Sequence, residues 1–283
     1  MKLACSDYTF PLLDHEDACA LIASLGFAGV NVGVWGSITQ LRADETAADP
    51  RGRGREVAER LARHGLVPAD VFLIADPDYS VLAVNHPSSE ERVRSREHFQ
   101  RWVEFADAVG ASGLTILPGL DFDGVAHEDS LSRAAEELAV RVQAAQEAGL
   151  EVSVEPHIGS VVASPDDTRR LVDLCPGLGL TLDHSHFIMQ GYAVPELDPV
   201  FGRVRHLHAR GARPDRLQVG MKENEIDYEY VVGGLRDTGF DGFLITEYLW
   251  IDQARCNECD TLSETILMRD RLLAAASAPP SAA

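Results

Sequence analysis

The stretch EVSVEPH, residues 151–157, decides the fold of this chain. Apolar and polar side chains alternate along it, as in a half-buried β-strand, and the carboxylate of Glu155 comes where a loop should begin. Three later segments repeat this arrangement of an apolar run that ends near one side chain able to bind a metal. They carry Asp183 in LGLTLDHSH, His208 in VRHLHARG and Glu247 in GFLITEY. Oxygen and imidazole ligands from four successive strands form a set that suits a divalent metal ion.

Strand-like and helix-like segments alternate along the whole chain. The helix-like segments show apolar residues at helical spacing, and several of them end at a glycine. The predicted strands cover residues 2–7, 28–35, 66–75, 113–119, 151–156, 177–186, 205–211 and 240–248, and the predicted helices cover 14–26, 56–65, 88–110, 130–149, 164–175, 196–204, 226–239 and 260–275. We interpret residues 42–55, which are rich in arginine and glycine, as a polar loop.

Eight strand and helix pairs in 283 residues give roughly 35 residues per pair, which is the size expected of a (β/α)8 TIM barrel. The rival architecture is a doubly wound open sheet, but the GxGxxG turn that marks its first strand and helix is missing. We therefore predict an α/β fold with a single barrel domain at residues 1–276 and a disordered tail at residues 277–283.

Charge and cysteine usage restrict the partners. The formal net charge of −20 opposes binding to nucleic acid or to an anionic membrane. Five scattered cysteines indicate reduced thiols and a cytoplasmic protein. Cys256 and Cys259 form a CxxC pair, but no further cysteine or histidine pair completes a zinc site.

In a barrel, the carboxyl ends of the strands meet at one face, so the four candidate ligands should converge there. A lone carboxylate at a strand end is more often solvated than functional. Three carboxylates and an imidazole brought together, however, need a cation to balance their charge. Residues two apart on a strand share a face, which adds His157 to Glu155 and Arg210 to His208. His186 follows Asp183 in the loop, within reach of a bound ligand.

The sequence resembles the xylose isomerase-like superfamily of sugar isomerase and epimerase barrels, which also includes inosose dehydratases and apurinic-site endonucleases. The resemblance covers nearly the whole chain, and its most specific parts are VEPH, LDHSH, HLHARG, ITEY and the run NEIDYEYVVGGLRDTGFDGF. It implies one Mn, Mg or Co ion, with Zn as a further candidate.

The resemblance also implies a role for each residue of the site. Glu155 and Glu247 would be metal ligands and the acid and base pair, Asp183 and His208 would be ligands only, and His186 would contact a substrate oxygen as a further catalytic residue. His157, Arg210 and Trp35 complete the expected substrate-binding set.

This chemistry predicts a metal-dependent isomerase or epimerase of a sugar, keto-sugar or inositol that transfers a proton through a metal-stabilised enediolate. The same scaffold also supports a lyase, either a dehydratase or an enzyme that removes the aglycone of a 3-keto-sugar, and His184 beside His186 keeps this alternative open. The three-metal endonucleases need more histidines than the early strands offer, so DNA repair is disfavoured. We expect a small-molecule substrate, no nucleic acid, no membrane, and a homo-oligomer, with a second kind of subunit left open.

Other residues support weaker hypotheses. Arg51, Arg53 and Arg55 would hold an anion or form a solvated loop. Trp35 would stack on a sugar ring or pack in the core. Lys222 is a further candidate for substrate contact.

Overall fold

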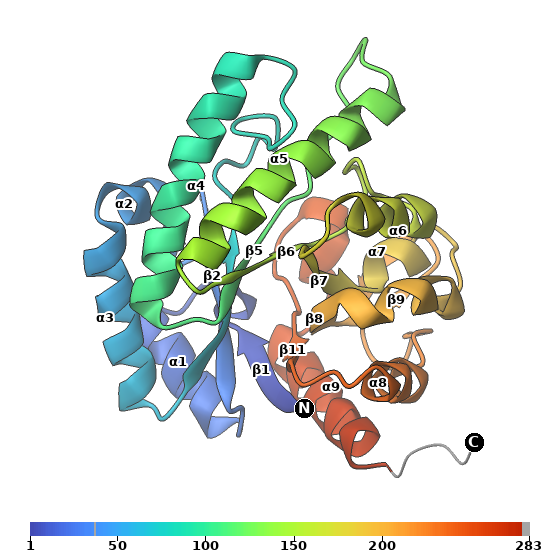
Figure 1. The fold of residues 1–283 in the computed structure, drawn as a ribbon. Helices are drawn as coiled ribbons and strands as arrows, with labels where there is room; N and C mark the ends of the chain where they lie inside the picture. The colour runs from blue at the N-terminus through green and yellow to red at the C-terminus, as the bar shows by residue number, and fades with distance from the viewer. Residues whose placement is uncertain (37, 279–283) are drawn as a thin grey trace.

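The computed structural model describes residues 1–36 and 38–278, and eight parallel strands form a closed barrel at its centre (Figure 1). The barrel strands are β1 (Lys2–Ser6), β2 (Gly29–Trp35), β4 (Val67–Leu73), β5 (Gly113–Ile116), β6 (Glu151–Val154), β7 (Gly179–Asp183), β8 (Val204–Ala209) and β11 (Phe243–Thr246). They are hydrogen-bonded in the order β1-β11-β8-β7-β6-β5-β4-β2, and pairing of β1 with β2 closes the cylinder. The predicted (β/α)8 barrel is confirmed.

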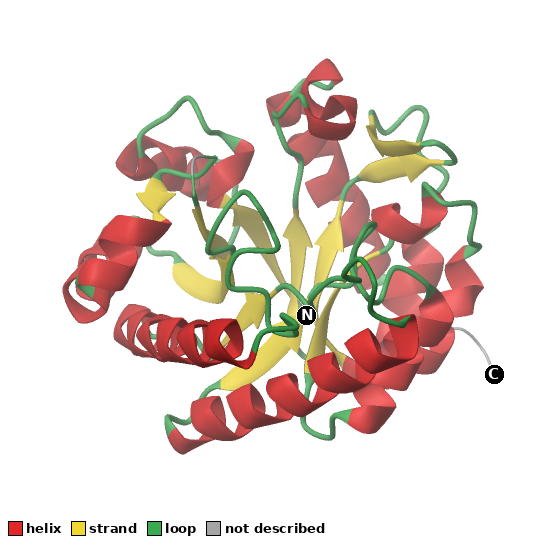
Figure 2. Cartoon of the chain, turned by 90° about the horizontal axis from the view of Figure 1, so that it is seen from above, coloured by secondary structure: helices red, strands yellow, loops and turns green. Residues whose placement is uncertain are grey.

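Helices surround the strands, as the view from above shows (Figure 2). The larger ones are α1 (His15–Ser24), α3 (Pro50–Arg63), α4 (Ser89–Val109), α5 (His127–Glu147), α6 (Pro165–Leu174), α8 (Tyr228–Asp237) and α9 (Thr261–Ser277). Shorter elements are α2 (Ala43–Ala48), α7 (Ser185–Ile188) and the 3-10 helices η1 (Asp7–Thr9), η2 (Val194–Arg203) and η3 (Gln253–Glu258). The helix predicted at 196–204 is thus a 3-10 helix with Pro199 inside it.

Local sequence signals explain where several helices begin and end. At α6, the Ser164 hydroxyl accepts a hydrogen bond from the backbone N–H of Asp167, and Pro165 takes the first helical position. Gly26, which follows α1, adopts a φ of +84°, a conformation that glycine reaches without strain.

The prediction of a polar loop at residues 42–55 was wrong, because most of these residues are helical. Asp49 accepts a hydrogen bond from the N–H of Gly52 and starts α3 six residues before the predicted helix. A Cβ on Gly54 would lie 2.5 Å from the Cβ of Ala108 on α4, so the glycine permits close helix packing. Tertiary contact with α4 has overridden the low helix propensity of glycine.

The sequence patterns also missed two small strand pairs. The short strand β3 (Leu41–Arg42) lies beside the end of β2. An antiparallel hairpin of β9 (Gly211–Arg213) and β10 (Arg216–Val219) follows β8. The hairpin brings β10 into contact with η3, the 3-10 helix that follows β11 along the chain.

Three hydrophobic clusters make up the apolar interior of the described residues, and the smallest consists of Ala4, Ala69 and Ile245. The large one fills the space between the strands and the surrounding helices. A smaller, separate cluster gathers residues from the carboxyl ends of the strands and the loops beyond them, among them Tyr8, Trp35, Phe72 and Leu249. Among residues 1–36 and 38–278, no helix is both long enough and apolar enough to span a membrane.

Helix α9 includes Ser277, the first residue of the predicted tail at 277–283. Residues 279–283 of this predicted tail lie outside the described part of the chain.

Candidate metal centre and active site

Strand register places the four predicted ligands at the same end of the barrel. Asp183 is the last residue of β7 and is paired in register with His208 on β8. Glu155 continues β6 through a hydrogen bond from its N–H to the carbonyl of Ile116, and Glu247 continues β11 through a similar bond to Ala209. All four side chains are buried.

His208 lies between the two glutamates. Its Nδ1 is 2.7 Å from Oε1 of Glu155 and 3.4 Å from Oε1 of Glu247. Three ligand atoms from these residues lie within 4.8 Å of one another. Strands β6, β8 and β11 thus bring three of the four predicted ligands together.

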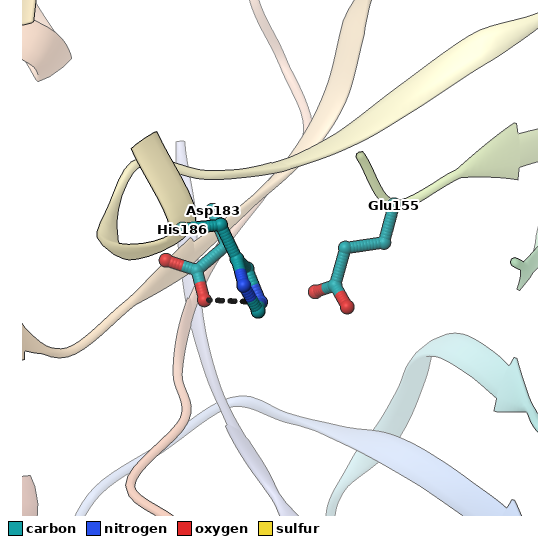
Figure 3. A group of neighbouring side chains, drawn as sticks. All are labelled: Glu155, Asp183 and His186. Atoms are coloured by element: carbon teal, nitrogen blue, oxygen red, sulfur yellow. Dashed lines mark ion pairs between the residues drawn. The ribbon is translucent and has the colours of Figure 1, made fainter. Parts of the chain in front are cut away.

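Asp183 belongs to a second group that shares Glu155. The carboxylate of Glu155 points toward Asp183 and His186, which come from the junction of β7 and α7 (Figure 3). Nε2 of His186 is 3.8 Å from Oδ2 of Asp183. Arg210 separates Asp183 from Glu247, since its Nη2 is 2.5 Å from Asp183 Oδ2 and 3.5 Å from Glu247 Oε2.

Burial and neighbouring charges shift the pKa values of all four candidate ligands in this cluster. Burial and the charge of Glu247 raise the pKa of Glu155 to about 7. Burial opposes ionisation of His208, but the charges of Glu247 and Glu155 hold the pKa of the imidazole well above its ordinary value. Burial likewise opposes ionisation of Asp183 and Glu247, yet Arg210 lowers the pKa of Asp183 to about 2, and His208 and Arg210 keep the pKa of Glu247 below its ordinary value.

This donor set fits a divalent cation. Burial and the nearby charge of Glu247 disfavour the ionised form of Glu155, and a bound cation would offset this cost. Oε2 of Glu247 is buried and accepts no hydrogen bond from the described residues, although Arg210 lies 3.5 Å away as an ion-pair partner, so this oxygen keeps the capacity to bind a cation.

Two residues that the sequence analysis missed hold the cluster in place. The Tyr8 hydroxyl donates to Glu247 Oε1 at 2.7 Å and accepts from Nδ2 of Asn31 at 3.0 Å. The Asn31 amide also lies 2.9 Å from Nε2 of His208. A polar asparagine inside the otherwise apolar run AGVNVGVW was the signal that could have identified this residue.

The predicted substrate-binding residues line a cavity of about 220 Å³ beside the cluster. His157 donates from Nδ1 to the carbonyl of Ile158, burial lowers its pKa, and its Nε2 has no partner among the described residues. Burial lowers the pKa of His186 to about 3, so this ring is neutral. Trp35 lines the cavity and also packs against Tyr8, with ring centroids 4.5 Å apart.

The arginines at residues 51 and 53 make surface ion pairs. Arg51 pairs with Glu104 and Asp107, and Arg53 pairs with Glu45 and Glu56.

His184, Lys222 and the CxxC pair also lie apart from the cavity lining. His184 packs edge-on against Phe201, with ring centroids 5.9 Å apart, and Lys222 is exposed. Cys256 and Cys259 are free thiols.

Comparison with known proteins agrees with this architecture. Residues 19–266 match the model of the family described as "Xylose isomerase-like TIM barrel". An inosose dehydratase of Clostridium perfringens (strain ATCC 13124) is 23% identical over 233 residues, which cover 69% of this chain and 77% of the relative.

Solved structures support the same fold. The IOLI protein with a bound zinc atom has a TM-score of 0.75 at 16% identity, with 98% of both chains covered. The D-psicose 3-epimerase from Clostridium cellulolyticum H10, crystallised with D-tagatose, has a TM-score of 0.74 at 13% identity, with 97% of this chain and 96% of that chain covered. Because the family model spans most of the sequence, this chain belongs to the xylose isomerase-like TIM barrel family.

Proposed function

We propose that this protein is a divalent-metal-dependent isomerase or epimerase that acts on a sugar, keto-sugar or inositol. The observation that carries the proposal is the convergence of Glu155 and Glu247, from separate strands, on His208 and on one cavity. Glu155, Asp183, His208 and Glu247 are the residues that would hold the metal, with Mn, Mg, Co and Zn as candidates.

The polar end of the cavity suits the oxygens of a hydroxyketone. Nη1 of Arg210 and Nε2 of His157 are buried without partners among the described residues, so one donor and one acceptor remain for a ligand. His186 adds a neutral imidazole to the same lining. A substrate with a carbonyl and neighbouring hydroxyl groups would satisfy these atoms.

The two glutamates would carry the proton transfer. One carboxylate removes the proton from the carbon beside the carbonyl, and the electron pair moves to the carbonyl oxygen to give an enediolate. The other glutamate, in its carboxylic acid form, donates a proton to the same carbon from the opposite face in an epimerase, or to the neighbouring carbon in an isomerase. A divalent cation bound at the site would polarise the carbonyl and stabilise the developing negative charge.

A dehydratase is the second candidate, and the 23% identity to inosose dehydratases favours it. Here the same proton is removed, but the electron pair forms a double bond between two carbons. The hydroxyl group on the next carbon then leaves as water after it takes a proton from the second carboxylic acid.

Deuterium incorporation from solvent separates these reactions. The purified protein is supplied with metal and a panel of ketoses, inososes and keto-glycosides in D2O. We expect it to incorporate deuterium at one carbon next to a carbonyl of a substrate, without loss of water from that substrate. A new double bond with release of water would instead identify the dehydratase.

Glu155→Gln and Glu247→Gln should each slow labelling by roughly a hundredfold or more, because each removes a proton-transfer group. Glu147→Gln, an exposed position on α5, is the matched control and should keep the wild-type rate. Full labelling rates in both site variants, or no labelling of any compound, would contradict the proposal.

A further inference from the structure

A second cavity, of about 70 Å³, lies between the barrel and the two long helices α4 and α5. Its lining comes from the ends of β4 and β5, from the loop that joins β4 to α4, and from one face of α4. That face presents Ser95, His98, Phe99 and Trp102, which follow one another at the spacing of neighbours on a helix. Arg141 reaches the second cavity from α5.

Arg141 is a charged side chain with an exposed fraction of only 1%. Its guanidinium donates to the backbone carbonyl of Glu137 at 2.8 Å, to Oε2 of Glu137 at 3.0 Å and to the hydroxyl of Ser95 at 2.8 Å. A guanidinium has five N–H groups, so two donors of Arg141 have no partner among residues 1–36 and 38–278. A buried donor without a partner is unfavourable, and a ligand in the second cavity could supply the acceptor.

Positive charge exceeds negative charge around Arg141. Oε1 of Glu137 accepts hydrogen bonds from Arg92 at 3.0 Å and from Arg96 at 2.9 Å. Three guanidinium groups therefore share the single carboxylate of Glu137. Within the described part of the chain, the one carboxylate that lines the second cavity is Asp76, and it accepts a backbone hydrogen bond inside its own loop. An anion in the second cavity would balance part of this positive charge.

His98 adds a further polar atom to the lining. Its Nε2 is buried and has no hydrogen-bond partner among the described residues. Burial and the charge of Arg101 lower the pKa of this imidazole, so the ring is neutral at neutral pH. A neutral imidazole that carries its proton on Nε2 can donate to an oxygen of the same anion.

The rest of the second cavity is mostly apolar, with buried side chains of Leu73, Val84, Phe99, Trp102 and Ile116. Since one water molecule needs about 10 to 15 Å³ of such a space, there is room for roughly five to seven non-hydrogen atoms. An inorganic anion of this size would turn some of its oxygens toward side chains that offer no hydrogen bond. A carboxylate on a short alkyl chain complements both the polar and the apolar part of the lining.

We propose that the second cavity is a binding site for a small monocarboxylate with an apolar chain of about three carbon atoms. The carboxylate lies at Arg141 and His98, and the chain lies against Phe99, Trp102 and Ile116. This site is separate from the candidate metal centre, and the inference does not rest on the proposed function.

Three residues, Ile74, Tyr79 and Leu117, line both the second cavity and the 220 Å³ cavity. A carboxylate could also bind a metal ion, so the test must report which of the two cavities the ligand enters. The tryptophans provide this readout. Trp102 lines the second cavity, Trp35 lines the 220 Å³ cavity, and Trp250 is 45% exposed outside both linings.

Titration of the 15N-labelled protein with butyrate in the presence of magnesium chloride follows the indole N–H resonances by NMR. We expect the resonance of Trp102 to move most, while those of Trp35 and Trp250 stay close to their starting positions. Butyrate should bind roughly tenfold or more tightly than acetate, because two further methylene groups are buried. Butan-1-ol lacks the charge and should bind more weakly than butyrate by roughly the same factor.

Arg141→Met removes the charge with little change in side-chain volume, and it should weaken butyrate binding by roughly tenfold or more without a matching effect on butan-1-ol. His98→Leu, at a half-buried position, should weaken butyrate binding by roughly threefold and serves if Arg141→Met does not fold. Arg169→Met, at an exposed position on α6, is the matched control and should bind butyrate like the wild type.

Three outcomes would overturn the proposal. The first is a titration in which butyrate leaves the Trp102 resonance unchanged, and the second is one in which it moves the resonance of Trp35 instead. The third is equal affinity for butyrate in the wild type and in the folded variants of Arg141 and His98.

Discussion

Two of the candidate metal ligands, Glu247 and His208, each contact a polar residue from the start of the chain. Tyr8 on η1 contacts Glu247 at the end of β11, and Asn31 on β2 contacts His208 on β8. These contacts join η1 and β2, near the start of the chain, to the ends of β11 and β8. The sequence predicted the four candidate ligands, because each ends an apolar run, but it gave no sign of the partner of Tyr8, which depends on barrel closure.

Tyr8→Phe should weaken metal binding by roughly ten- to a hundredfold, because the hydroxyl that orients the Glu247 carboxylate is lost. Competition with a chromophoric chelator would measure the metal affinity. Tyr230→Phe is a matched control, since it removes a hydrogen bond from a tyrosine to Asp198 at the surface. Equal metal affinity in Tyr8→Phe and Tyr230→Phe would mean that Tyr8 only packs.

Secondary-structure elements differ in how far the sequence predicts them. The eight barrel strands are predictable, because apolar alternation and flanking turn residues act locally. Two other elements depend on tertiary contact: α3 begins early because Gly54 permits close packing on α4, and the β9–β10 hairpin contacts the segment after β11. Local patterns carry no information about such contacts.

The hairpin positions one wall of the cavity, and Gln218→Ala tests this role. The substitution leaves the N–H of Leu249 and two carbonyl groups without their side-chain partners. We expect faster hydrogen exchange of the Leu249 amide and a loss of roughly 2 to 3 kcal/mol in the free energy of unfolding. Gln143→Ala, at an exposed position on α5, should change neither quantity. Unchanged exchange at Leu249 in Gln218→Ala would show that the side chain does not anchor the segment.

At the scale of the whole molecule, the barrel interior also contains polar groups below the site. Asp70 accepts a hydrogen bond from Thr115, and Thr115 contacts Thr181 across the barrel at 2.6 Å. Burial raises the pKa of Asp70 to about 7, although Arg205 opposes the shift. The predicted strand at residues 66–75 includes Asp70, but the sequence pattern does not show that the carboxyl group of this residue is fully buried.

This buried carboxyl group should make stability depend on pH. The folded state keeps its proton up to about pH 7, whereas the unfolded chain releases it near pH 4, so the folded state binds more protons in between. The free energy of unfolding should therefore decrease as the pH rises from about 4 to about 7.

Urea unfolding of the wild type and Asp70→Asn at pH 5 and pH 8 checks this expectation. The stability of the wild type relative to the variant should fall between these pH values by on the order of 3 kcal/mol. Asp173→Asn, at an exposed position on α6, should show no such change. A stability difference between wild type and Asp70→Asn that is the same at both pH values would contradict the raised pKa.

The central claim is that side chains from four strands of the closed barrel jointly hold one divalent cation. Elemental analysis after dialysis against Mn, Mg, Co or Zn salts tests it most directly. We predict about one ion per chain in the wild type and in Asp173→Asn, and less than roughly a tenth of that in Asp183→Asn, Glu155→Gln and Glu247→Gln. A wild-type protein that retains none of these ions, or site variants that retain the full amount, would contradict the account.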